Sequence, residues 1–451
     1  MDERDLLALC HDLIERARSH GASEAEAIAT WDRSAETTLE NGDVHSAQST
    51  EETTFGLRAL DGRRMGFVTA NRTDPQTLDA CVREAVTQSR ATPADPFNVL
   101  PEPELCTAVD GLYDASTASI GVGETTAVAA DLVERVRQRD TRVRIDSGSV
   151  GVSVSATALV STSGIERSER QTVAHGYLFG MAVDGDDVAS FDYDGDASRV
   201  FLRVGDLLHA SADRFVDKCV AGLGAGKGRS FKGAIVLSPE AVGEFLLPNL
   251  IAAISADAVR KGRSRLAGKV GEAIASESLT IIDDGTRAGG IASSPFDREG
   301  VPLTRRTLVD RGTLTTYLYN TYEAAAAAGE ARSTGHATGS AASLPGIGPS
   351  FIEIGAGSTP AADLTSGADV TIHVGRFSGS SNPVTGEFSG VAKNAFLVER
   401  GDRHPVRETL IAGNLFEVLQ RITAISSERR LIGGTRLLPS LRIDGVSVTA
   451  G

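Results

Sequence analysis

A ten-residue stretch, LSPEAVGEFL, holds the side chains of this sequence that are best placed to do chemistry. Its two glutamates, Glu240 and Glu244, are four residues apart, so a helix would put both carboxylates on one face. Zinc peptidases carry their metal on such a helix, but with histidine ligands. Here Pro239 and Glu244 occupy the positions where histidines would be expected. By spacing alone, two carboxylates make at most a weak site for a hard cation.

The same stretch also has the signals of a well-capped helix. Ser238 is a favourable N-cap residue, and Pro239 suits the first helical position. Glu240 complements the positive end of the helix dipole. The spacing therefore favours a capped helix over a metal site.

The remaining metal-ligand residues are scattered along the chain. No two of the eight histidines have the spacing of a helical ligand pair, and no His-Glu-x-x-His segment occurs. These are His11, His20, His45, His175, His209, His336, His373 and His404. A site assembled from distant histidines remains open. The cysteines also match no zinc or redox spacing, and we interpret them as reduced thiols. They are Cys10, Cys81, Cys106 and Cys219.

Two further segments have compositions that occur in active sites. The segment GLGAGKGRS (222–230) lacks the first glycine of a phosphate-binding loop, and Gly228 follows its lysine, so we interpret it as a linker. No Gly-x-Ser-x-Gly elbow for a nucleophilic serine occurs. The serine-rich segment RFSGSSNP (376–383) could line a site, but its composition is more typical of a loop.

The elements around these motifs predict an α+β fold with two domains. We expect an N-terminal α+β domain of hairpins and helices over 1–225, and a β-rich, barrel-like mixed-sheet domain over 226–451 that carries the motif helix. The glycine-rich linker supplies the boundary. Hydrophobic spacing predicts helices over 3–19, 75–90, 123–139, 205–221, 239–261, 322–328 and 415–425, and short strands that include 25–32, 36–40, 53–60 and 314–319.

The charge and hydropathy of the chain exclude some partners. With 60 acidic and 45 basic residues its net charge is −15, which disfavours binding to nucleic acid. No run of 18 apolar residues occurs, so we expect no membrane span. The N-terminus lacks the apolar core of a signal peptide, and we expect a cytoplasmic protein.

Several blocks, in order along nearly the whole chain, resemble the TldD/PmbA (TldD/TldE) metallopeptidase family. They are LENGDVHSAQSTEETTFGLRALDGRRMGFVTAN (39–71), GGIASSPFDREGVPLTRRTLVDRGTLTTYLYNTYEA (289–324), NPVTGEFSGVAKNAFLVERG (382–401) and IAGNLFEVL (411–419). TldD-like members of the family are similar to zinc peptidases with a His-Glu-x-x-x-His helix, in a segment resembling HEAVGH. PmbA/TldE-like members lack this motif.

Aligned with that segment, this chain has Pro239-Glu240-Ala241-Val242-Gly243-Glu244. The glutamate that would act as general base is present, but both histidine ligands are replaced. The resemblance also implies a cysteine ligand in the C-terminal half, whereas the last cysteine of this chain is Cys219. The resemblance therefore implies that the motif is vestigial and that this chain binds no metal and no cofactor. It also implies that the chain by itself is catalytically inactive.

The resemblance implies a PmbA/TldE-like subunit that pairs with a TldD-like zinc metallopeptidase and supports its action on peptides or unfolded segments. A homodimeric hydrolase is an alternative, with a metal site built from Glu240, Glu244 and distant histidines. A non-enzymatic, protein-binding regulator of a topoisomerase or toxin system is another.

Overall fold

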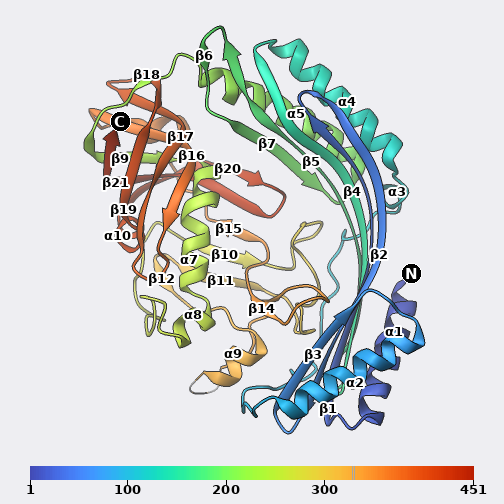
Figure 1. Cartoon of the computed structure of the whole chain (residues 1–451). Helices are drawn as coiled ribbons and strands as arrows, with labels where there is room; N and C mark the ends of the chain where they lie inside the picture. The colour runs from blue at the N-terminus through green and yellow to red at the C-terminus, as the bar shows by residue number, and fades with distance from the viewer. Residues whose placement is uncertain (328, 330) are drawn as a thin grey trace.

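The fold was analysed in a computed structural model that describes residues 1–327, 329 and 331–451. The chain folds as α+β, with an antiparallel sheet in the N-terminal half and a barrel in the C-terminal half (Figure 1). This confirms the predicted fold class. The first sheet ends at Ser198 and the second begins at Gly226, while the domain boundary at 225 stays a prediction.

The N-terminal sheet has the order β3-β2-β1-β4-β5-β6, and β7 also pairs with β5. Its first turn, Asn41–Gly42, has two residues with positive φ (51° and 75°), as the tightest hairpins require. The strands are β1 (Glu24–Glu40), β2 (Asp43–Asp61), β3 (Arg64–Ala70), β4 (Val143–Ser161), β5 (Glu166–Asp184), β6 (Asp187–Val188) and β7 (Asp192–Ser198).

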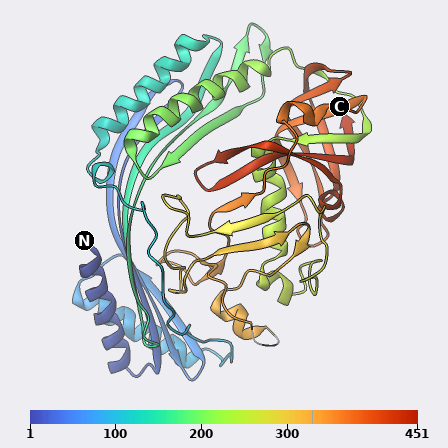
Figure 2. The same cartoon turned by 180° about the vertical axis from the view of Figure 1, so that it is seen from behind.

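Helices cover the convex face of this sheet, and its concave face turns toward the C-terminal half (Figures 1 and 2). They are α1 (Glu3–Ser19), α2 (Pro75–Ala91), α3 (Ala115–Ala118), α4 (Val122–Arg139) and α5 (Phe201–Ala221). Buried apolar side chains of α1 and α2 pack on one end of the sheet, and those of α4 and α5 on the other. None of the described helices is long and apolar enough to cross a membrane.

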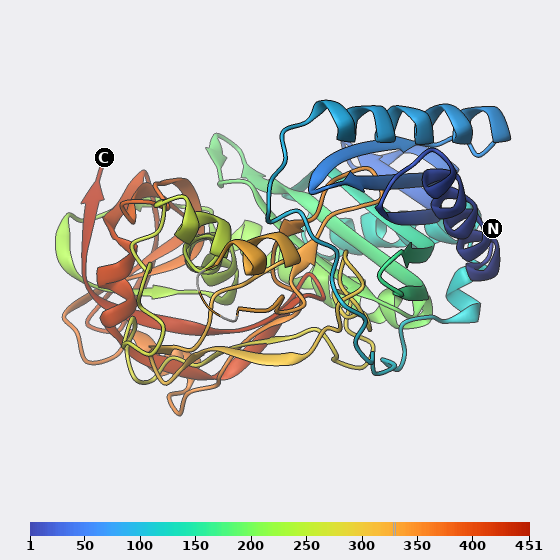
Figure 3. The same ribbon diagram turned by 90° about the horizontal axis from the view of Figure 1, so that it is seen from below.

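The C-terminal half is built on a closed ring of five strands, each paired with the next and the last paired with the first. In ring order they are β9 (Phe231–Leu237), β16 (Val370–Ser381), β17 (Glu387–Glu399), β19 (Thr409–Asn414) and β21 (Arg436–Ala450). Seen from below, the two halves lie side by side (Figure 3). The β9–β16 pair is parallel, so the sheet is mixed.

Further strands extend this sheet or pair beside it. They are β8 (Gly226–Lys227), β10 (Ile281–Asp284), β11 (Arg305–Asp310), β12 (Thr313–Leu314), β13 (Ala337–Thr338), β14 (Gly346–Ile347), β15 (Ile352–Ile354), β18 (Asp402–Arg407) and β20 (Ile422–Ile432). The helices are α6 (Pro239–Ala241), the π turn η1 (Val242–Leu246), α7 (Leu247–Ala253), α8 (Ala256–Arg260), α9 (Thr321–Ala326), the 3-10 turn η2 (Ala361–Thr365) and α10 (Leu415–Gln420).

Several predicted boundaries are wrong. The two strands expected over 25–32 and 36–40 are one strand, β1, paired along its whole length with β2 and β4. The helix expected over 415–425 ends at Gln420, because β20 begins at Ile422 and pairs with β21. The strand expected over 314–319 is a strand only to Leu314.

Two more differences concern the segments that were singled out for chemistry. The serine-rich segment expected as a loop is strand up to Ser381, because it pairs with β17 as a long hairpin. The helix expected over 239–261 is interrupted after Ala253, where Ser255 bridges to Leu318 before α8 begins. The helix expected over 322–328 runs over Thr321–Ala326, and Ala328 lies outside the described residues.

Candidate functional site

The motif helix begins as its sequence predicts. Ser238 is the N-cap, its Oγ accepts from the Ala241 N–H at 3.1 Å, and Pro239 occupies the first turn. The next turn is a π turn, with the Leu247 N–H bonded to the Val242 carbonyl. Such turns often mark functional sites. The expectation that Glu240 and Glu244 share one face assumed regular α-helical spacing. The π turn changes that spacing between the two residues.

The motif helix is anchored in the core of the barrel. Val242 and Leu246 are fully buried, and the Phe245 ring lies 4.7 Å from that of Phe377 and 4.5 Å from that of Phe388, both on barrel strands. Packing at this density leaves the helix little freedom to move. The polar side of the helix faces β7, α5 and β20 of the same chain.

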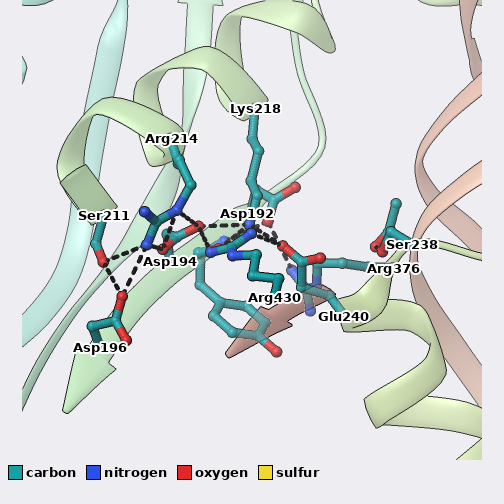
Figure 4. A network of polar contacts seen from close by, with 12 residues as sticks. Asp192, Asp194, Asp196, Ser211, Arg214, Lys218, Ser238, Glu240, Arg376 and Arg430 are labelled. Carbon is teal, nitrogen blue, oxygen red and sulfur yellow. Dashed lines mark hydrogen bonds and ion pairs between the residues drawn. The ribbon is translucent and has the colours of Figure 1, made fainter. Parts of the chain in front are cut away.

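Glu240 is buried and bound by two cations (Figure 4). Its Oε1 lies 2.7 Å from Lys218 Nζ on α5 and also accepts from Arg430 Nη1 on β20. Burial would raise the pKa of Glu240, but Lys218 and Arg430 outweigh burial and hold it below its usual value. Glu240 is therefore an ionised, ion-paired carboxylate.

Asp194 on β7 joins the same cations from the opposite side. Its carboxylate receives Arg214 Nη2 at 2.8 Å, Lys218 Nζ at 2.8 Å and Arg430 Nη2 at 2.7 Å, and its side chain is 0% exposed. Burial opposes ionisation, but Lys218 and Arg214 lead the groups that hold the pKa of Asp194 low. The remaining Lys218 N–H reaches the Tyr193 carbonyl at 3.3 Å, so all three lysine donors are engaged.

Glu244 is held by a different set of donors. Its Oε1 accepts from the Tyr193 hydroxyl at 2.8 Å and from Arg376 Nε at 3.1 Å, and its Oε2 accepts from the Phe377 N–H at 3.0 Å. The Arg376 guanidinium stacks 4.3 Å from the centre of the Tyr193 ring. Three donors on two elements thus fix the residue that occupies the second histidine position.

The remaining members of this cluster are two further aspartates of β7. Asp196 lies 3.1 Å from Arg214 Nη2, and Asp192 lies 3.8 Å from Arg376 Nη1. Burial raises the pKa of both carboxyl groups. Asp192 Oδ2 is buried without a hydrogen-bond partner among the described residues. We call the whole cluster the motif network; it contains Asp192, Tyr193, Asp194, Asp196, Arg214, Lys218, Glu240, Glu244, Arg376 and Arg430.

The side chains at the motif do not fit a zinc ion. Pro239 offers no ligand atom, and Glu240 and Glu244 already accept bonds from cations and from a tyrosine hydroxyl. Structural and catalytic zinc sites use three or four histidine, cysteine or carboxylate ligands that converge on one point. Across the residues that the structure describes, no group of three such side chains is placed to hold a metal ion.

The histidines and cysteines do not supply the missing ligands. Six histidines lie against carboxylates at separate places: His11, His20, His45, His175, His209 and His336. His373 on β16 lies near enough to Glu240 for that carboxylate to favour its protonated form. Burial and Arg403 outweigh this effect and lower the pKa of His373 to about 4. All four cysteines are free thiols.

Most of the motif network was missed by the sequence analysis. The network's three aspartates lie in the segment DYDGD (192–196), where an acidic residue occurs at every second position. This pattern places all three side chains on one face of a strand. Arg214 and Lys218 are four residues apart on a correctly predicted helix, so they too share a face. These two patterns were the available signals. Nothing in the local sequence ties Arg430 or Arg376 to them.

A second buried cluster joins Arg298 and Glu299 of the block PFDREGVP to the N-terminal sheet, and so connects the same two halves of the chain. Arg58 Nη2 on β2 lies 2.7 Å from Glu26 Oε2 on β1, and Arg298 Nη1 lies 3.0 Å from Glu26 Oε1. Glu299 completes it, 3.3 Å from Arg58. No member's side chain is more than 7% exposed. We call these four residues the clamp cluster.

An apolar groove of about 790 Å³ starts where the motif helix ends. One side is formed by Leu247, Pro248 and Ile251 of α7. The other side includes residues 347–350 and the turn of the β16–β17 hairpin. Arg436 lies at the groove and also donates to the Gly243 carbonyl of the motif helix at 2.9 Å. This is a suitable size for a ligand or peptide segment.

Comparisons with known proteins agree with these features. Residues 230–450 match the family model of the PmbA/TldA metallopeptidase C-terminal domain, and residues 25–89 match that of domain 1. An uncharacterized protein of Methanocaldococcus jannaschii is 28% identical, over 90% of this chain and 92% of that protein. The metalloprotease PmbA of Escherichia coli O157:H7 is 25% identical, over 90% of this chain and 88% of PmbA.

Solved structures share the fold over nearly the whole chain. The crystal structure of TldE from Thermococcus kodakarensis has a TM-score of 0.89 and 23% identity, and covers 98% of this chain and 100% of TldE. A structure from Thermotoga maritima, described as a putative modulator of a DNA gyrase, has a TM-score of 0.87 and 21% identity, over 98% of this chain and 99% of that one. These likenesses show the fold. The two family models, which together match more than half of the chain, establish that it belongs to the PmbA/TldD metallopeptidase family.

Proposed function

We propose that this chain is a PmbA/TldE-like, non-catalytic subunit of a cytosolic TldD-type zinc metalloprotease that processes peptides and unfolded segments. A partner chain with an intact His-Glu-x-x-x-His helix would bind the zinc and cleave the substrate. The observation that carries the proposal is the ion pairing of Glu240, whose carboxylate is engaged by Lys218 and Arg430.

The chemistry of a metallopeptidase explains why this pairing matters. A catalytic glutamate accepts a proton from a water molecule that a metal ion has activated, so it needs both the metal and a free oxygen facing the water. The residue before Glu240 is a proline, Pro239, where a histidine ligand would be needed. Lys218 and Arg430 also keep the pKa of Glu240 below its usual value, against the effect of burial. A carboxylate in this state is a poor proton acceptor.

The role in peptide processing is supported by the family and by the surface next to the motif. A relative that matches 90% of this chain is named a metalloprotease. The apolar groove beside α7, which residues 347–350 also line, has room for side chains of an extended peptide. The four free cysteines fit the reducing cytosol.

Co-expression with a relative tests this proposal. The genome is searched for a His-Glu-x-x-x-His relative, whose absence would contradict the proposal; the chain and that relative are then purified separately and together, and cleavage of a fluorogenic unfolded peptide is followed. We expect no cleavage by the chain alone, and cleavage by the complex that a chelator abolishes. Glu240→Gln in this chain should leave the activity of the complex unchanged, whereas the same change in the partner's motif should remove it. Chelator-sensitive cleavage by the isolated chain would overturn the proposal.

A further inference from the structure

The groove beside α7 has two walls that run in opposite directions, and this fixes its two ends. One wall follows the chain from Leu247 at the start of α7 to Asp257 in α8. The other wall runs from Ile352, which pairs with Arg436 on β21, back to Ile347, which meets Asp257 again at a neighbouring cavity. Because Arg436 also donates to the motif helix, it marks the end of the groove next to that helix, and Asp257 marks the far end.

The lining between these ends is mostly apolar. Apolar side chains of α7 form one side, and Pro383 and Val384 of the hairpin turn lie on the other. Ser255 and Thr435 add hydroxyl groups among the apolar side chains. Peptide groups can form hydrogen bonds with these hydroxyls, whereas an alkyl chain would leave them without a partner. The lining therefore favours an extended peptide over a lipid tail.

One charge in this lining is left uncompensated. Of the three charged residues that line the groove, Asp257 and Arg263 pair with each other at 2.7 Å. Arg436 forms no ion pair with any carboxylate that the structure describes, and one of its five N–H donors is engaged, by the Gly243 carbonyl at 2.9 Å. A half-buried guanidinium with free donors can bind a carboxylate through two parallel hydrogen bonds. The groove is thus apolar along its length and positive at one end.

We infer that this groove binds an extended, apolar peptide segment with a carboxylate at the Arg436 end. The inference deepens the proposed function and rests on it in one respect, because that function makes a peptide the ligand. The carboxylate is either the C-terminus of the peptide or the side chain of an aspartate or glutamate, since both present two oxygens to a guanidinium. At the far end, Asp257 is already paired with Lys261 and Arg263, so no free negative charge there selects a basic residue.

Binding of labelled peptides to the isolated full-length chain tests the role of the carboxylate. The probes are apolar pentapeptides with fluorescein on the N-terminus, followed by fluorescence anisotropy. One has a free C-terminal carboxylate, the second a C-terminal amide, and the third is an amide whose last residue is glutamate. We expect the free acid to bind at least about tenfold more tightly than the plain amide, as one charge-assisted pair would provide. The glutamate peptide identifies the source: it matches the free acid if a side-chain carboxylate serves, and the plain amide if only a C-terminus does.

Single substitutions test the two parts of the groove. Arg436→Gln removes the charge but keeps an amide that can donate to the Gly243 carbonyl, and it should abolish the preference for the free acid over the amide. Arg203→Gln makes the same charge change at an exposed position of α5 and should not. Ala252→Trp fills the groove from α7 and should weaken all peptides by at least about tenfold, whereas Ala210→Trp on the exposed side of α5 should not. Urea unfolding of each variant separates a lost contact from a lost fold.

The outcomes separate this inference from the proposed function. Equal affinity of the wild-type chain for the free acid and the amide would overturn the inference, as would a preference that survives Arg436→Gln or the absence of any peptide binding. Tighter binding of decanoate, which has the carboxylate and an apolar chain but no peptide groups, would overturn the assignment to a peptide. None of these measurements needs the His-Glu-x-x-x-His relative. A failure of the two chains to cleave peptides together would overturn the proposed function and leave the binding result standing.

Discussion

The motif network and the clamp cluster both join the N-terminal sheet to the C-terminal half through buried ion pairs, but their charge balance differs. The clamp has two glutamates and two arginines, all nearly inaccessible. The motif network has five carboxylates and four cations, namely Arg214, Lys218, Arg376 and Arg430. Each cluster has one buried polar atom without a hydrogen-bond partner among the described residues, Arg58 Nε in the clamp and Asp192 Oδ2 in the network. The clamp thus has balanced charges, whereas the network holds one more carboxylate than cations.

The largest effect should follow from opening the clamp. Arg298→Met removes a cation that binds Glu26 at 3.0 Å and also donates to the Ser340 carbonyl at 3.1 Å. Removing one partner of a buried pair leaves the other charge uncompensated, so we expect a loss of about 3–5 kcal/mol in the free energy of unfolding. Urea unfolding measures it. Arg305→Met removes an arginine whose side chain is 54% exposed and 3.5 Å from Asp284, and should cost less than about 1 kcal/mol. Equal costs for the two variants would refute the structural role of the clamp.

A smaller loss is expected in the motif network from Asp194→Asn. Its three cations lose a shared acceptor, but each keeps another: Glu240 for Lys218 and Arg430, Asp196 for Arg214. The expected cost is about 2–3 kcal/mol by urea unfolding, below that of Arg298→Met. A cost above that of the clamp variant would reverse the comparison between the two clusters.

The smallest effect is a dependence on pH. Lys218 and Arg430 hold the pKa of Glu240 low in the folded state. This stabilisation is fully present above the pKa of a glutamate in the unfolded chain, about 4.3. It is lost as the pH falls through the lower pKa that Glu240 has in the folded chain. The difference in unfolding free energy between wild type and Lys218→Met should therefore shrink between pH 6 and pH 3, as protonation of Glu240 removes its ion pair with Lys218. A difference that is constant with pH would contradict the pairing of Glu240.

The two clusters also differ in how far the sequence reveals them. The motif helix, its cap and its missing ligands could be predicted because they are local: Ser238, Pro239 and Glu240 are consecutive. The partners of Glu240 could not, because Lys218 and Arg430 come from elements separated from it by 22 and 190 residues and meet only in the folded chain. The π turn was missed for another reason, since its residues have the composition of an ordinary helix.

At the level of the fold, long amphipathic elements were predicted well and strand lengths poorly. The helices α1, α2 and α4 have apolar residues at helical spacing and end within a residue or two of the expected positions. By contrast, β16 extends through a serine- and glycine-rich segment that has little strand propensity of its own. Pairing with β17 makes it a strand, and the local sequence does not encode that pairing.

Zinc content is the most direct test of the central claim, that side-chain cations stand where the family's metal centre would lie. The wild-type chain and the Pro239→His/Glu244→His double variant are incubated with zinc, dialysed and analysed for bound metal. We expect neither to retain stoichiometric zinc, because Lys218 and Arg430 remain beside the site and Cys219, the residue next to Lys218, is buried with its thiol on the Gly180 carbonyl. Stoichiometric zinc in the wild-type chain, lost on Glu240→Gln, would contradict the account.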